Sequence, residues 1–157
     1  MGHSNGAIAA VQAATIDVNA VGVLGLDAVE AMGADHTQQA ALLSVPAYGL
    51  FGESDQCNDS NSGLAVFKNA PTNINLRVAE AGHCDFEAPT DALCELAPGC
   101  DGPNSQFTEE SIQNTILNLG TSFIRWRLSQ DADAETWWTA GEQGYESLLT
   151  SGSIQPL

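Results

Sequence analysis

Residues 20–26 read AVGVLGL, an apolar run without alternation that ends abruptly at Asp27. Such a run is typical of a strand that is covered on both faces, as in a parallel sheet. Residues 45–52, VPAYGLFG, form a second run of this kind, with Pro46 at its start, where a missing N–H is tolerated. Residues 73–80, NINLRVAE, predict a third strand, because apolar and polar side chains alternate there.

Helical segments alternate with these strands along the chain. Residues 5–15 are rich in Ala and predict a helix that packs closely on its neighbours, and residues 62–69 predict a short helix. Residues 35–44 are expected to form a short helix or a loop. Thr108 can cap a long helix that runs to about Leu128. The alternation predicts an α/β fold, in which about three parallel strands are flanked by helices.

The length and charge of the chain limit what it can be. Its 157 residues suit one domain over 1–157, with a C-terminal helical segment over 107–150 that includes a short helix with Trp137, Trp138 and Tyr145. Four Lys and Arg against 20 Asp and Glu give a net charge of −16, which argues against nucleic acid and anionic membranes as partners. No apolar run reaches the roughly 18 residues of a membrane span.

All four cysteines lie in the middle of the chain, at Cys57, Cys84, Cys94 and Cys100. An even number with one close pair indicates disulfides and an oxidising compartment. Of the three possible pairings, we expect Cys94–Cys100 with Cys57–Cys84. Free thiols in a cytosolic protein are the alternative. Since no two cysteines form a C-x-x-C pair, a zinc ribbon is not expected.

Polar residues just past the strand ends are the usual functional positions of a parallel sheet. This rule places Asp27, Asp55 and His83 on one edge of the predicted sheet. Residues 2–6, GHSNG, match G-x-S-x-G directly ahead of a helix, a turn that exposes the serine hydroxyl and points the next backbone N–H, that of Asn5, into the same site. The helix N-terminus also favours a developing oxyanion. The pattern predicts Ser4 as a nucleophile.

A serine nucleophile needs a base that accepts its proton at neutral pH, and histidine does this best. His83 follows the third predicted strand, whereas His3 lies inside the serine motif and His36 lies in a polar segment with no strand before it. Either Asp27 or Asp55 could orient and charge-stabilise His83.

Metal binding is not expected in the same region. His83, Cys84 and Asp85 are adjacent, and adjacent residues rarely converge on one ion. The polar stretch from Asp55 to Gly63 lacks the closing glutamate of a calcium loop.

The chain resembles the α/β-hydrolase superfamily, and within it the chlorophyllase and dienelactone-hydrolase-like lipases and esterases. The matching stretches cover nearly the whole chain: GHSNG (2–6), GLDAVE (25–30), VPAYGLFGESDQCN (45–58), AGHCDFEAPTDALC (81–94) and FIRWRL (123–128). The resemblance implies an enzyme without a cofactor that hydrolyses a small-molecule or lipid-like ester.

The resemblance also implies roles for individual residues. Ser4 is the nucleophile, His83 is the general base, and the backbone N–H of Asn5 is one oxyanion donor. Members with a Leu-Asp motif after the strand that follows the nucleophile helix have the acid there, which would be Asp27. Other members have the acid one strand later, which would be Asp55. We favour Asp27, because a disulfide and a turn are expected to occupy the loop around Cys57.

The sequence departs from the family at its start. Complete members have several strands and helices before the serine motif, so the chain looks like the C-terminal half of a hydrolase with an open edge at strand 20–26. We therefore expect the isolated chain to be marginally stable, sticky or inactive. The alternative function is a non-catalytic, disulfide-bonded binding or interaction fragment. The expected location is secreted or periplasmic, with the cytoplasm as the alternative, although residues 1–6 lack the features of a signal peptide.

Overall fold

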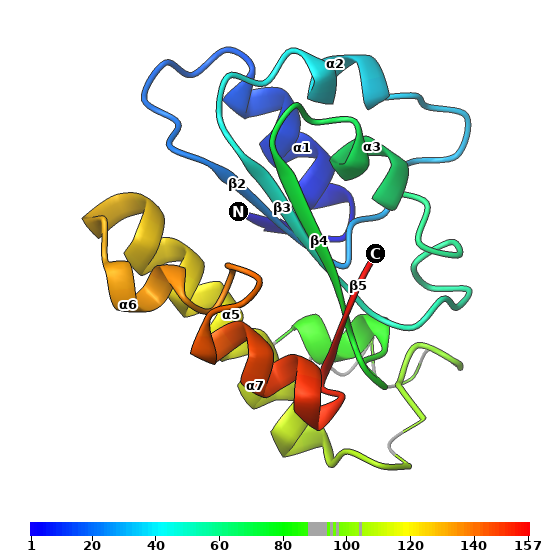
Figure 1. Ribbon diagram of the computed structural model, residues 1–157. Helices are drawn as coiled ribbons and strands as arrows, with labels where there is room; N and C mark the ends of the chain where they lie inside the picture. The colour runs from blue at the N-terminus through cyan, green and yellow to red at the C-terminus, as the bar shows by residue number, and fades with distance from the viewer. Residues whose placement is uncertain (88–93, 95, 97, 104) are drawn as a thin grey trace.

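The computed structural model is an α/β fold built on a five-stranded, mostly parallel sheet (Figure 1). The structure describes residues 1–87, 94, 96, 98–103 and 105–157. The elements follow in the order β1 (Gly2–His3), α1 (Asn5–Ala14), β2 (Val23–Leu26), α2 (Thr37–Ala41), β3 (Ala47–Phe51), α3 (Leu64–Lys68), β4 (Asn73–Val78), η1 (His83–Phe86), α5 (Glu109–Ser129), α6 (Ala132–Glu135), α7 (Gln143–Ser151) and β5 (Ile154–Pro156).

The sheet has the spatial order β1-β2-β3-β4-β5, so each strand lies beside its neighbour in the chain. Strands β1 to β4 are parallel, and β5 is antiparallel to β4. The α/β class is therefore confirmed, but the expected number of about three strands is wrong. The expectation that strand 20–26 forms the open edge is also wrong, because β1 pairs with β2 and is itself the edge strand.

Two apolar layers cover the sheet, one on each face. On one face, β-strand residues such as Leu50 and Leu76 pack against Ile116, Leu119 and the other apolar residues of α5. On the other face, α1, α2 and α3 contribute a second cluster with residues of β2 and β3. Figure 1 shows α1–α3 and α5–α7 on opposite sides of the sheet. Strands β2 and β3 are thus covered on both faces, as their apolar runs predict.

The C-terminal helices differ from the prediction in one detail. The long helix α5 begins after Thr108, whose side chain accepts a hydrogen bond from the Ser111 N–H, as the cap predicts. The expected single short helix around Trp137, Trp138 and Tyr145 is two helices, α6 and α7, and the two tryptophans lie in the turn between them. The Trp138 indole is buried and donates to the Leu119 carbonyl at 3.1 Å. That hydrogen bond satisfies the one polar atom of a core side chain.

All four cysteines form disulfides, but the expected pairing is wrong. The bonds are Cys57–Cys100 and Cys84–Cys94. The segment at Cys100 runs beside the turn that follows β4, and its carbonyl accepts the Cys84 N–H at 3.2 Å. This path brings Cys100 to the loop after β3, where Cys57 lies. Two disulfides are consistent with an oxidising environment.

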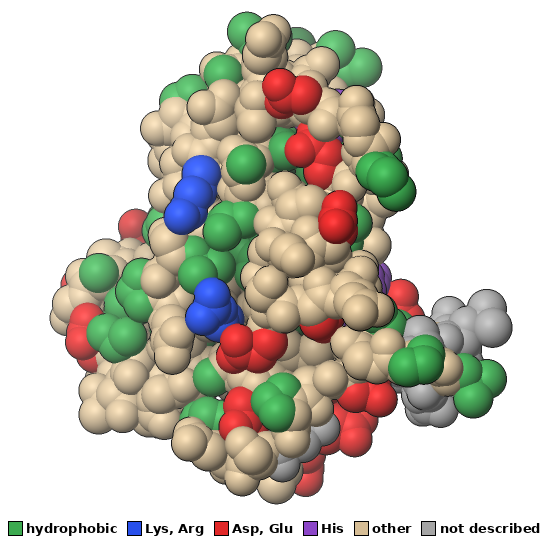
Figure 2. Space-filling model, turned by 90° about the vertical axis from the view of Figure 1, so that its right-hand side faces the viewer, with side chains coloured by type: hydrophobic (Ala, Val, Ile, Leu, Met, Phe, Trp, Pro, Cys, Tyr) green, Lys and Arg blue, Asp and Glu red, His purple; other side chains and the backbone are tan. Residues whose placement is uncertain are grey.

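The surface reflects the acidic composition. On the face shown in Figure 2, acidic side chains outnumber basic ones, and hydrophobic side chains are spread among polar atoms. This matches the net charge of −16. In the part of the chain that the structure describes, no helix is both long and apolar enough to span a membrane.

Candidate active site

Three of the predicted site residues follow strands at the same edge of the sheet. Ser4 follows β1, Asp27 follows β2, and His83 opens η1 after β4. The parallel register pairs His3 with Leu26, and the Ser4 N–H donates to the Leu26 carbonyl at 3.0 Å. Ser4 and Asp27 are therefore the next residues on neighbouring strands, which lie about 4.8 Å apart in a sheet.

The turn at Ser4 has the geometry that the G-x-S-x-G pattern predicts. Ser4 has φ 55° and ψ −132°, a conformation that L side chains rarely adopt, and α1 starts at the next residue. A Cβ on Gly2 would meet the Gly6 carbonyl oxygen at 2.2 Å, so this glycine lets the strand and helix approach. Gly6, the other glycine of the motif, has no such steric role, because a Cβ there would have open space.

The start of α1 supplies free backbone N–H groups beside Ser4. The first N–H groups of a helix have no carbonyl partner within the helix, and they carry its partial positive charge. The N–H of Asn5, the expected oxyanion donor, belongs to this first turn. The side chain of Asn5 donates to the Val29 carbonyl at 3.4 Å, which directs it away from its own N–H. The turn can therefore stabilise negative charge that develops next to the Ser4 hydroxyl.

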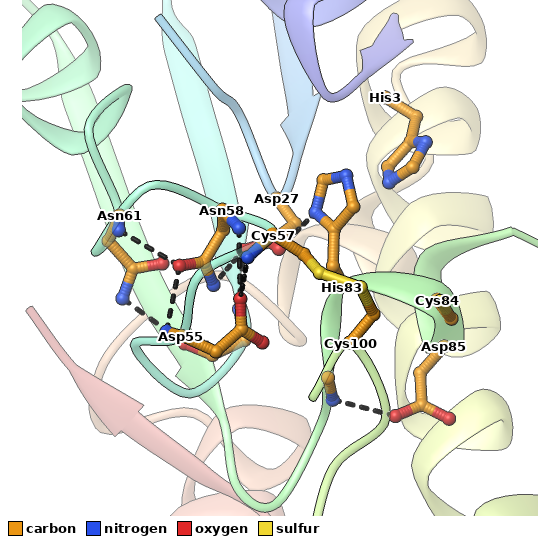
Figure 3. Close-up of polar contacts among 12 residues, drawn as sticks. His3, Asp27, Asp55, Cys57, Asn58, Asn61, His83, Cys84, Asp85 and Cys100 are labelled. Atoms are coloured by element: carbon orange, nitrogen blue, oxygen red, sulfur yellow. Dashed lines mark hydrogen bonds and ion pairs between the residues drawn. A yellow bond between two sulfur atoms is a disulfide. The ribbon is translucent and has the colours of Figure 1, made fainter. Parts of the chain in front are cut away.

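His83 is joined to Asp27 by a short, buried contact. The Nδ1 atom of His83 lies 2.6 Å from Oδ2 of Asp27, and Asp27 is fully buried while His83 is 9% exposed (Figure 3). The other oxygen of Asp27 accepts the Gly52 N–H at 2.8 Å and is 3.5 Å from Nδ2 of Asn58. Because a carboxylate only accepts, Nδ1 of His83 carries the proton, and Nε2 keeps the lone pair that a base needs.

Asp55 instead accepts hydrogen bonds within the loop that follows β3. One of its carboxylate oxygens accepts the N–H groups of Cys57 at 2.7 Å and Asn58 at 2.9 Å. Within the described ranges, no contact joins Asp55 to His83. The loop in turn presents Asn58, whose Nδ2 donates to the Glu53 carbonyl at 2.6 Å and faces Asp27 (Figure 3). Asp55 thus affects Asp27 only indirectly, because it helps to hold the loop that presents Asn58.

The turn that carries His83 is tied down on both sides. Asp85 accepts the Gly82 N–H at 2.7 Å, and Cys84 is bonded to Cys94. A Cβ on Gly82 would meet the Cys100 carbonyl at 2.3 Å, so the segment at Cys100 packs directly on this turn. Burial raises the pKa of the Asp85 carboxyl above its ordinary value, and its hydrogen bond with Gly82 opposes this.

Ser4 and His83 are not hydrogen-bonded to each other in the described part of the chain. The ring of His3 lies against the His83 ring, with centroids 4.5 Å apart. Contacts between a nucleophile and its base are often long without substrate and shorten in the reacting complex. The arrangement brings an imidazole, a carboxylate and a serine at a helix start to one edge of the sheet.

An apolar cavity of about 330 Å³ lies beside this edge. Leu26, which precedes Asp27, and Phe86, which follows His83 in η1, line it together with Ile116 of α5. Its volume falls at the lower end of the range for small-ligand pockets. Among the residues that the structure describes, no group of three His, Cys, Asp or Glu side chains could hold a metal ion.

Three residues of this region were not predicted from the sequence. Asn58 contacts Asp27, Asp85 contacts the turn that carries His83, and His3 contacts the His83 ring. The position of His3 directly before Ser4 was a usable signal, since neighbouring strand ends bring such a residue close to other strand-end side chains. A comparison with protein-family models and with curated proteins found no match.

Proposed function

We propose that the chain is a serine hydrolase of the α/β-hydrolase type that cleaves carboxylic esters. One observation carries the proposal. The buried Asp27–His83 pair, with its atoms 2.6 Å apart, lies at the same edge of the sheet as Ser4, which has a positive φ and directly precedes helix α1. A buried acid–histidine pair next to an accessible serine hydroxyl is the arrangement that activates the hydroxyl for nucleophilic attack, and Ser4 is partly exposed.

Each residue has a distinct part in the proposed reaction. The Ser4 hydroxyl attacks the ester carbonyl and passes its proton to Nε2 of His83. Asp27 keeps the ring in the correct tautomer and stabilises the imidazolium that forms. The N–H groups at the start of α1, with that of Asn5 first, stabilise the oxyanion. His83 then protonates the leaving alcohol, and water, activated by the same ring, releases the acyl group from Ser4.

The cavity beside the site supports the choice of an ester with an apolar group. Most of its lining is apolar and includes Leu26, Phe86 and Ile116, and its polar side chains are Asp85, Gln113 and Thr121. Its volume of about 330 Å³ suits a small acyl or aromatic group and not a large polar head group.

The test is labelling with a fluorophosphonate, which phosphonylates an activated serine. Because β1 covers the edge of strand 20–26 that was expected to be open, the wild-type protein is expected to be labelled, and Ser4→Ala is expected to abolish labelling. Ser60→Ala is the matched control, because Ser60 is an exposed serine whose φ, 57°, is as positive as that of Ser4. A well-folded wild-type protein that is not labelled would exclude the hydrolase and favour a non-catalytic, disulfide-bonded binding module.

A further inference from the structure

His3 joins the serine turn to the turn that carries His83. It belongs to β1, directly before Ser4, and its ring lies against the His83 ring with centroids 4.5 Å apart and planes at 35° (Figure 3). Its Nδ1 lies 3.2 Å from a carboxylate oxygen of Glu87, the residue that follows η1. One side chain from β1 thus contacts the base and the residue that ends its turn.

The surroundings of His3 favour the uncharged ring. Burial, and after it the charge of His83, lower the pKa of His3, while Glu87, Asp27 and a hydrogen bond with the His83 backbone act in the opposite direction. Since Nδ1 faces a carboxylate, it carries the proton of the neutral ring and Nε2 keeps a lone pair. That Nε2 atom is buried and has no hydrogen-bond partner among the described residues.

We propose that His3 is a positioning residue of the same site: its neutral ring, held by Glu87, supports the His83 ring in the orientation in which it contacts Asp27. This role rests on the proposed function, because it acts through the base. His3 itself exchanges no proton with the substrate. The His3 ring instead contacts the His83 ring and limits how far it can turn. Ser4 is the next residue after His3 in the chain.

The same contact makes protonation of His3 harmful to the reaction. His83 must become an imidazolium when it accepts the Ser4 proton, and a second imidazolium in contact with it opposes that charge. Asp27 stabilises the charge of His83, and Glu87 that of His3. The active form therefore requires a neutral His3 ring, which burial favours.

The first readout is the rate of fluorophosphonate labelling as a function of pH. The acid side of the wild-type profile is expected to be steeper than that of His3→Phe, because protonation of His3 adds to the loss of activity. His3→Phe keeps a ring but cannot be charged, so its profile should be less steep, with a modest loss of rate. His3→Ala removes the ring, and misplacement of the base should lower the rate about 10- to 100-fold at neutral pH.

The second readout does not depend on activity. The proton on Nδ1 of His83 should give a strongly downfield NMR resonance, which is expected to persist in His3→Phe and to broaden or disappear in His3→Ala. His36→Phe is the matched control, because His36 also pairs with a carboxylate, Glu30 at 2.9 Å, but lies outside the site. It should leave both readouts unchanged.

The two readouts separate failure of this inference from failure of the proposed function. If no serine is labelled but the His83 resonance disappears in His3→Ala and remains in His36→Phe, the hydrolase is wrong and the positioning contact is right. If His3→Ala retains the wild-type resonance, or the wild-type labelling rate and slope, His3 does not position the base. Circular dichroism of each variant confirms that the compared proteins are folded.

Discussion

Replacement of Asp27 by Asn should inactivate the site without unfolding the protein. In the wild type, one oxygen of Asp27 accepts a hydrogen bond from the Gly52 N–H at 2.8 Å. The other oxygen accepts a hydrogen bond from Nδ1 of His83 at 2.6 Å. The asparagine oxygen must stay on Gly52, because the reverse orientation would direct two N–H donors at each other. The amide NH₂ then faces His83 and donates to Nδ1, so the ring must carry its own proton on Nε2.

A proton on Nε2 removes the lone pair that accepts the Ser4 proton. The loss expected for this wrong tautomer is about 10⁴-fold in rate, which corresponds to about 5.5 kcal/mol of transition-state stabilisation. The backbone should accept the change, because Asp27 has φ 41° and Asn is among the residues that best tolerate the left-handed region. We therefore expect a folded protein that has lost nearly all of its reactivity.

The assay is the second-order rate of fluorophosphonate labelling, with Asp55→Asn as the control. Asparagine at position 55 keeps an oxygen that can accept the N–H groups of Cys57 and Asn58, so this variant should stay within about tenfold of the wild-type rate. If Asp27→Asn were labelled within tenfold of the wild type while Asp55→Asn lost several orders of magnitude, the assignment of the acid would be wrong.

Three further predictions concern stability. Replacing both Cys57 and Cys100 by Ser opens a loop of 43 residues and should cost up to about 4 kcal/mol of unfolding free energy, with slower labelling because the segment packed on the His83 turn is released. Burial raises the pKa of Asp85 above 3.8, so its charge destabilises the fold as the pH rises through the raised pKa. Asp85→Asn should therefore raise the melting temperature at pH 7, and the difference should vanish in acid below the ordinary pKa; a lower melting temperature at pH 7 would contradict this. Hydrogen bonds from Ser105, Gln106 and Phe107 lower the pKa of Glu80 to about 2 from 4.5, so its stabilising effect is complete above pH 4.5 and is lost as the pH falls toward 2. Glu80→Gln should lower the melting temperature at pH 7 but not at pH 2, and an equal effect at both values would show that the charge is not responsible.

The sequence predicted the elements that are long enough to carry a pattern. Strands β2, β3 and β4 and helices α1 and α5 all lie within the predicted ranges or within two residues of them. Strands β1 and β5 have only two and three residues, too few for any periodicity. They are strands because β2 and β4 offer them free backbone groups at the right register, which is a property of the folded sheet.

The choice between Asp27 and Asp55 could not be made from strand order alone, because each follows a buried strand. The structure separates them through local hydrogen bonds. Asp55 accepts the N–H groups two and three residues ahead of it, a common habit of Asp in a turn. The polar composition around Asp55 was the available signal, since an aspartate used by its own turn is less free to orient a distant histidine.

The predicted disulfide pairing was wrong because it assumed that cysteines close in sequence are also close in space. Cys94 and Cys100 are close in sequence, yet Cys100 lies against the turn of His83. Glycines make this approach possible: a Cβ on Gly102 would overlap the Glu80 carbonyl at 1.7 Å. Backbone contacts this close depend on how two distant segments meet, and spacing of cysteines does not encode them.

At the ends of three strands, residues other than glycine have positive φ. Ser4, Asp27 and Glu80 follow β1, β2 and β4 with φ of 55°, 41° and 60°. Such conformations cost on the order of 1–3 kcal/mol each, and glycine would relieve them. A glycine would also remove a side chain that is in use: Asp27 holds His83, and Glu80 holds three backbone N–H groups. At Ser4 the retained group is the hydroxyl that the proposed reaction requires, so the strain there is best explained by chemistry and not by packing.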